Sequence, residues 1–164
     1  MTVLSTQRDV DALTLTFVAD FDAPPERVWQ VWEDPRQLER WWGPPTWPAT
    51  FPRHEFRPGG RSSYYMTGPD GTQAWGWWRI VDLDKPRRLE YEDGFADDKG
   101  EPTGELGVTR GVVTFEDLGG RTRMTSVSTF ESAEQLEQMV QMGMEEGMRG
   151  AMGQIDELLA ESRV

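Results

Sequence analysis

The chain has 164 residues, a length that suits one domain built around one hydrophobic core. Its 17 lysines and arginines against 29 aspartates and glutamates give a formal net charge of −12, which argues against nucleic acid and anionic membranes as partners. The lack of cysteine and the presence of 1 histidine exclude disulfides, thiolate sites and zinc sites with several imidazole ligands.

The first predicted elements are a strand and two short helices. The strand covers residues 13–21, where leucine and phenylalanine alternate with threonine at a period of two. Pro25 suits the first position of a helix. Asp34 and Pro35 predict the cap and the first residue of a second short helix, which the segment GPPTWP at 43–48 ends.

Six short runs rich in β-branched and aromatic residues follow, separated by turns rich in glycine and proline. They cover residues 49–57, 61–67, 72–83, 88–93, 109–117 and 121–130. Such a series predicts an antiparallel meander, and with the first strand the sheet has about seven strands. The acidic stretch 92–105 is expected to be a solvated loop.

The last predicted element is a long helix from Ala133 to about Glu161. Ser132 and Gln135 match a capping box at its start. Apolar residues recur at helical spacing along one stripe: Val140, Met144, Met148, Ala151, Ile155 and Leu158.

The order of these elements predicts an α+β fold of helix-grip type. An antiparallel sheet would wrap around the long C-terminal helix, and the two short helices after the first strand would close one end. We expect a single domain over residues 1–164, with an ordered core at about 10–161. A cavity between the sheet and the terminal helix is also expected, because one helix does not fill a large curved sheet at every level.

Several segments, in their order and spacing, resemble a known family. They are FDAPPERVWQVWEDPRQLERWWGPP at 21–45, EFRPGG at 55–60, MTGPDG at 66–71, RRLEYEDGF at 87–95, VVTFEDLGGRTRMT at 112–125 and MGMEEGMRGAMGQIDELL at 142–159. The chain resembles the SRPBCC, or START-like, helix-grip superfamily. Within it, the chain is similar to the branch homologous to the activator of the heat shock protein 90 ATPase, whose bacterial members are often called polyketide cyclase/dehydrase-like. The superfamily includes lipid carriers, hormone receptors, cyclases and co-chaperone domains, and the resemblance implies no agreed catalytic residue.

Strand alternation and helix periodicity predict which side chains line the cavity. The candidate ligand-binding residues are His54, Phe56, Tyr64, Met66, Trp78, Tyr91, Met124, Ser126, Met144 and Met148. Aromatic rings, flexible thioethers and a few polar groups suit a mostly apolar ligand. The alternative interpretation is that the same residues simply fill the core.

His54 is the one weak catalytic candidate. Its imidazole would titrate near neutral pH and so suit general acid or base chemistry. No acidic residue is placed to orient it, since Glu55 should point to the opposite face of its strand. The alternative is a core histidine that is hydrogen-bonded to a neighbouring hydroxyl or carbonyl.

The tryptophans, 8 in all, mark two further features. Those on the two short helices would close the mouth of the cavity. Trp77 and Trp78 are adjacent on one strand and must face opposite sides, so one of them lies outside the grip as a candidate homodimer contact.

Three functions are therefore open. The leading hypothesis is the binding of a small hydrophobic or aromatic molecule. The second is a cyclase or dehydratase-type enzyme that uses His54 and the hydroxyls of Tyr64, Tyr91, Ser126 or Ser128. The third is a chaperone-interacting protein of the stress response, as the name of the resembling family suggests.

No metal and no cofactor is expected, because the calcium-loop spacing, the phosphate-binding glycine loops and the nucleophile-elbow motif are all lacking from the sequence. The N-terminal residues carry no signal-peptide pattern, and no apolar stretch reaches the length of a membrane helix. The expected location is cytoplasmic, without membrane insertion.

Overall fold

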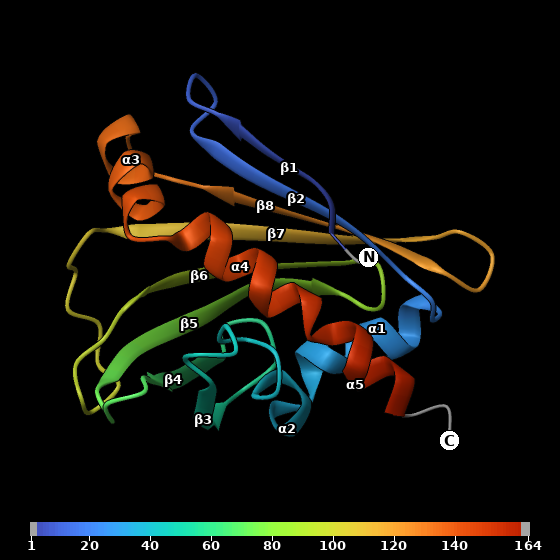
Figure 1. Ribbon diagram of the computed structural model, residues 1–164, viewed down its shortest axis with the longest axis horizontal. Helices are drawn as coiled ribbons and strands as arrows, with labels where there is room; N and C mark the ends of the chain where they lie inside the picture. The colour runs from blue at the N-terminus through green and yellow to red at the C-terminus, as the bar shows by residue number, and fades with distance from the viewer. Residues whose placement is uncertain (1–2, 162–164) are drawn as a thin grey trace.

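The computed structural model describes residues 3–161 (Figure 1), and its main feature is one antiparallel sheet of 8 strands in the order β1-β2-β8-β7-β6-β5-β4-β3. The strands are β1 (Val3–Asp9), β2 (Thr14–Phe21), β3 (Ala49–His54), β4 (Arg61–Thr67), β5 (Gln73–Asp84), β6 (Arg88–Phe95), β7 (Val108–Asp117) and β8 (Thr122–Thr129). The meander from β3 to β8 pairs each strand with the next, as the turn signals predict. The predicted α+β fold with a wrapped antiparallel sheet is confirmed.

The predicted count of seven strands is wrong by one, because β1 pairs with β2 at the edge of the sheet. The sequence of β1, VLSTQRD, shows no alternation of apolar and polar residues. Ser5, Gln7 and Arg8 are exposed, so this edge strand buries little and leaves no pattern to recognise. Leu13 lies in the turn before β2 with a positive φ of 59° rather than in the strand.

Helices cover only one face of the sheet (Figure 1). They are α1 (Pro25–Glu33), α2 (Pro35–Leu38), α3 (Ala133–Gln141), α4 (Met144–Gly153) and α5 (Ile155–Glu161). The predicted C-terminal helix forms over the expected residues, but it is divided into three segments. Gly143 has a left-handed φ of 87° and ends the first of them, so α3 is turned away from α4.

The helix-covered inner face of the sheet carries the core. Leu15, Phe17, Val113 and Met124 alternate along their strands with outward side chains, and each is fully buried. From the C-terminal helices, Ile155 is fully buried in the same cluster. The predicted apolar stripe of these helices therefore faces the core: Ala151, Ile155 and Leu158 are buried in it, and Val140, Met144 and Met148 pack partly buried against it.

Trp77 faces outward, as the alternation predicts, yet it is only 9% exposed. Its indole lies over Gly94 of the neighbouring strand, where a Cβ atom would come within 2.6 Å of the ring nitrogen. Gly100, in the β6–β7 connection, lies against Ser63 on the same outer face. The exposed tryptophan that we expected as a dimer contact is therefore covered.

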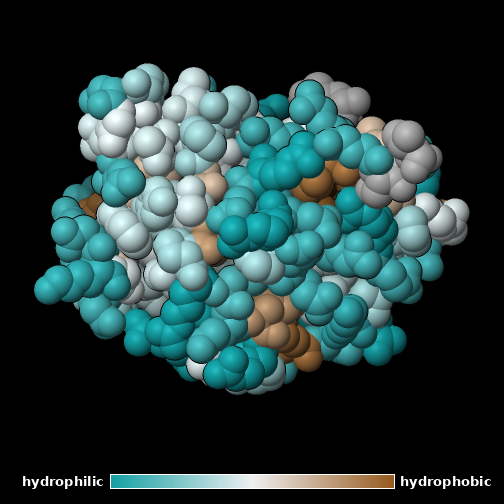
Figure 2. Space-filling view, turned by 90° about the horizontal axis from the view of Figure 1, so that it is seen from below, coloured by the Kyte–Doolittle hydropathy of each residue, from teal (hydrophilic) through white to brown (hydrophobic). Residues whose placement is uncertain are grey.

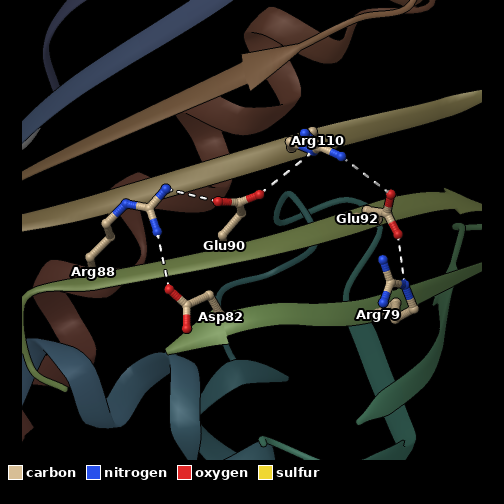
Figure 3. Close-up of polar contacts among 6 residues, drawn as sticks. All are labelled: Arg79, Asp82, Arg88, Glu90, Glu92 and Arg110. Carbon is tan, nitrogen blue, oxygen red and sulfur yellow. Dashed lines mark hydrogen bonds and ion pairs between the residues drawn. The ribbon is translucent and has the colours of Figure 1, made fainter. Parts of the chain in front are cut away.

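The outer face of β5, β6 and β7 is held by charge pairs (Figure 3). Glu92 lies 2.7 Å from Arg79 and Glu90 lies 2.8 Å from Arg88, while Arg110 lies 3.7 to 3.8 Å from both glutamates. Arg88 also pairs with Asp82 at 3.6 Å. Seen from below, the molecule is mostly hydrophilic, with small and separate hydrophobic patches (Figure 2).

Candidate functional site

The interior between the sheet and the short helices holds a cluster of aromatic side chains. Trp32 comes from α1, Trp42 from the segment after α2, and Tyr64, Trp78 and Tyr91 from the inner face of the sheet. The ring centroids of Trp42 and Trp78 lie 4.7 Å apart at 85°, and those of Trp78 and Tyr91 also lie 4.7 Å apart. Such edge-to-face and tilted pairs are favourable beyond their buried area.

Two glycines let the tyrosine rings lie flat on the sheet. Gly76 faces Tyr64 across β4 and β5, and Gly111 faces Tyr91 across β6 and β7. A Cβ atom at Gly76 would lie 2.3 Å from the Tyr64 ring, and one at Gly111 would lie 2.5 Å from the Tyr91 ring. Glycine at these positions is therefore required for the close approach.

Tyr64 reaches across β5 to a carboxyl group. Its hydroxyl donates a hydrogen bond of 2.9 Å to Oδ1 of Asp93, which lies on the same face of β6 as Tyr91. Burial raises the pKa of Asp93 to about 7, against smaller opposite effects of the Tyr64 hydroxyl and the Gly94 amide. Burial, and then the charge of Asp93, also raise the pKa of Tyr64 and of Tyr91. Asp93 therefore changes its charge near neutral pH while the two phenols stay protonated.

Two indole nitrogens of this interior, those of Trp32 and Trp78, have no hydrogen-bond partner among the described residues, and neither has the hydroxyl oxygen of Ser126 on β8. The Trp42 side chain is hydrogen-bonded to Tyr64, which lowers the pKa of that phenol against the larger effect of burial. A buried polar group without a partner costs about 1–3 kcal/mol. The interior therefore contains polar groups that could form hydrogen bonds but have no partner within the protein.

His54 occupies both of its ring nitrogens in the fold. Nε2 donates to the carbonyl of Trp32 at 3.0 Å, so Nδ1 accepts from the Ser62 hydroxyl at 2.7 Å. Burial lowers the pKa of His54, and the Trp32 carbonyl opposes this effect. The neutral ring thus links the end of α1 to β4. This arrangement matches the alternative given above for His54, a core histidine that is hydrogen-bonded to a neighbouring hydroxyl and carbonyl.

The structure places the ten predicted lining residues in three groups. The first group lies around the aromatic cluster: Trp78 has the rings of His54, Tyr64 and Tyr91 within 6.4 Å of its own. The second group, Met124 and Ser126, lies fully buried on the inner face of β8.

The third group lies at the margin of the core. Met66, Met144 and Met148 are partly buried and pack against the core, and so does Phe56. The ring of Phe56 lies between two others, with centroid distances of 5.3 Å to His54 and 5.7 Å to Trp29 of α1. The assignment of these residues to a ligand site stays a prediction.

Two surface hollows lie outside this interior. One of about 220 Å³ surrounds the start of α3, and one of about 360 Å³ lies at the start of β7 and the end of β8, beside Glu92 and Glu131. Neither lining includes any of the ten predicted residues. The aromatic cluster itself is closely packed.

Asp93 is the residue that the sequence reasoning missed. Asp93 is the last residue of the predicted strand 88–93 and also falls in the acidic stretch 92–105, which is predicted as a solvated loop; β6 in fact continues to Phe95. Its alternation with Leu89 and Tyr91, both buried, was the available signal.

Within residues 3–161 there is no group of three or more acidic or imidazole side chains that could hold a metal ion. None of the helices in the same range is long and apolar enough to span a membrane.

Comparisons with known proteins show which family shares this sequence and architecture. The family model described as "Activator of Hsp90 ATPase homolog 1-like protein" matches residues 22–160. Among proteins of curated function, none matches the chain.

Solved structures of similar proteins match over nearly the full length. A protein from Arthrobacter aurescens is 61% identical with a TM-score of 0.94, and the match covers 98% of this chain and 93% of that one. A protein from Mycobacterium smegmatis is 49% identical with a TM-score of 0.89, covering 96% of both chains. A protein from Staphylococcus epidermidis is 26% identical with a TM-score of 0.84, covering 97% of this chain and 95% of that one. The resemblance seen in the sequence is confirmed, and the chain belongs to the family of proteins like activator of Hsp90 ATPase homolog 1.

Proposed function

We propose that the protein binds a small, mostly apolar molecule between the inner face of the sheet and the C-terminal helices. The observation that carries the proposal is the unused hydrogen-bonding capacity of the aromatic interior. Trp32 and Trp78 hold unpartnered indole nitrogens there, in the same ring cluster as Tyr64, whose hydroxyl is bonded to Asp93. Apolar walls with a few convergent polar groups are typical of ligand sites.

The margin of the core offers the route of entry. Met66, Met144 and Met148 are only partly buried, and they flank the closely packed cluster. Methionine adapts its shape easily, so these side chains can move aside without a change in the sheet. A ligand would enter past the methionines and take its polar contacts from the cluster.

Titration with Nile red, a neutral dye whose emission rises in apolar surroundings, tests the proposal. We expect saturable binding to the native protein with quenching of tryptophan fluorescence. Met148→Trp adds bulk at the margin of the core and should weaken dye binding at least about fivefold. Arg149→Trp, one residue along the same helix and exposed, is the matched control and should bind as the wild type does.

Two results would overturn the proposal. One is a native protein that does not bind the dye or any molecule retained in native mass spectrometry. The other is equal weakening by Met148→Trp and Arg149→Trp, which would place the dye on the surface of α4 rather than beneath it.

A second function, proton transfer on such a ligand, is favoured by one observation. The pKa of Asp93 is raised to about 7 by burial, which is the range in which a carboxyl group exchanges protons well at neutral pH. A cyclase or dehydratase-type reaction would use Asp93 with Tyr64 rather than His54, whose nitrogens are both engaged. Turnover of a bound molecule by the wild type but not by Asp93→Asn would support it.

Contact with a chaperone, and with it a part in the stress response, is suggested by the description of the family alone. Retention of the protein by an immobilised chaperone ATPase, together with a change in ATP turnover, is the test for this third function. A cytoplasmic location stays a proposal as well.

A further inference from the structure

Asp93 differs from its neighbours on β6 in having no basic partner. Glu90 and Glu92 point to the outer face, and each pairs with arginines there (Figure 3). Asp93 points to the inner face and takes a hydrogen bond from a neutral phenol. In the described part of the chain no ion pair involves this carboxyl group.

The surroundings of Asp93 carry no lysine or arginine that faces it. On the sheet, the titratable groups of the inner face near Asp93 are Tyr64 and Tyr91 beside it, and His54, whose ring is neutral and engaged elsewhere. Arg8 of β1 shares the inner-face register with Leu15, but it is exposed on the edge strand, four strands away from β6. On the covering helices α3, α4 and α5 the one basic residue is Arg149, which is exposed, while Glu145 of α4 is half-buried.

Arg27 of α1 is also directed away from Asp93. Its guanidinium group donates to Gln37 of α2 and to the carbonyl of Leu158 on α5. Among the described residues of α1, α3, α4 and α5, the basic side chains thus lie at the surface or are bonded to groups other than Asp93. A carboxylate in this position gains most from a cation that arrives with a ligand.

The rings around Asp93 suit a cation as well. Tyr64, Tyr91, Trp42 and Trp78 form a continuous set, with centroid distances between 4.7 and 6.4 Å. Faces of tryptophan and tyrosine attract ammonium groups, most strongly where water is excluded. The net charge of −12 adds a long-range attraction for cations.

We propose that the molecule bound on the inner face is an organic cation, an amine carried on an apolar body, with Asp93 as its counter-charge. This inference rests on the proposed function and names the class of its ligand. The ammonium group lies against the carboxylate of Asp93 and the nearby ring faces, and the apolar body lies under the methionines of α4.

Calorimetric titration with a matched pair of probes tests the inference. The probes are 1-naphthylmethylamine, which is cationic, and 1-naphthylmethanol, which is neutral and nearly the same in shape. At pH 8 we expect the amine to bind at least about tenfold more tightly than the alcohol. At pH 6 the amine is still protonated but Asp93 is mostly neutral, so this preference should shrink about tenfold, while binding of the alcohol stays the same.

Asp93→Asn should remove the preference for the amine at both pH values. Glu92→Gln makes the same change of charge one residue away on the outer face, and it should retain the preference. The comparison of the two probes on the wild type needs no variant, so the inference is tested even if Asp93→Asn fails to fold.

Failure of this inference is distinct from failure of the proposed function. Equal affinity of the wild type for amine and alcohol, or loss of the preference in Glu92→Gln as much as in Asp93→Asn, overturns the cation assignment and leaves ligand binding in place. Absence of binding by both probes and by Nile red overturns the two proposals together.

Discussion

The stability of the protein should fall as the pH rises from 5 to about 8, through the titration of Asp93. The pKa of this carboxyl group is raised by burial from 3.8 to about 7 in the folded state. The folded state thus holds a proton that the unfolded state releases, and raising the pH favours unfolding. The loss begins above the unfolded pKa and levels off above the folded one.

The magnitude follows from the two pKa values. A shift from 3.8 to about 7 corresponds to a loss of about 4 kcal/mol once both states are ionised, of which about 3 kcal/mol falls between pH 5 and pH 9. Movement of water or side chains toward the charge would reduce this figure, so it is an upper bound. The effect remains a large fraction of the stability of a domain of this size.

The assay is urea denaturation of the wild type and of Asp93→Asn at unit steps from pH 5 to pH 9. His54 acts in the opposite direction at the acidic end, because burial lowers its pKa and its charging destabilises the folded state. The readout is therefore the difference between the two proteins, from which the contribution of His54 cancels. Asparagine keeps the shape of the side chain and cannot ionise. The free energy of unfolding of Asp93→Asn should therefore increase relative to that of the wild type as the pH rises. Parallel stability curves for the two proteins would refute the reasoning.

Three further substitutions test the packing around the site. Ile155→Ala should lower the free energy of unfolding by about 2–5 kcal/mol in denaturant titration, since Ile155 is fully buried in the core; an unchanged midpoint would contradict this burial. Gly76→Ala should destabilise the protein and displace the Tyr64 ring, seen as a changed near-ultraviolet circular dichroism spectrum, because the new Cβ atom would lie 2.3 Å from that ring; a spectrum like that of the wild type would count against the close approach. Ser126→Ala should leave stability unchanged or raise it by up to about 1 kcal/mol, because the lost hydroxyl has no partner; a loss above about 1 kcal/mol in thermal unfolding would show that the hydroxyl is hydrogen-bonded.

Most of the fold was predictable because the buried face of each strand repeats at a period of two. The alternation that placed Tyr91 and Met124 inside also holds in the structure. Strand β1 was not predicted because it lies at the edge of the sheet and its polar residues are exposed. The break at Gly143 was hidden for a different reason, since apolar spacing continues across it and only the backbone dihedral reveals the turn.

The candidate site was predictable as a region but not in its chemistry. Parity alone brought His54, Tyr64, Trp78 and Tyr91 to one face, where the structure has them in contact. The alternation of side chains along a strand does not show which polar groups form hydrogen bonds with each other. The pairing of Tyr64 with Asp93 spans β5 and depends on a glycine between them, a relation that only the register of three strands shows.

The indole N–H resonances in a proton–nitrogen correlation spectrum test the binding of a small molecule to the inner face most directly. Trp42 and Trp78 lie inside the aromatic cluster, and the N–H group of Trp78 has no partner, whereas Trp77, 9% exposed, faces the outer side of the sheet. During titration with a small apolar probe such as 1-naphthylmethanol, the indole signals of Trp42 and Trp78 should move while that of Trp77 stays in place. Movement of the Trp77 signal alone, or of no indole signal at saturating probe, would contradict the account.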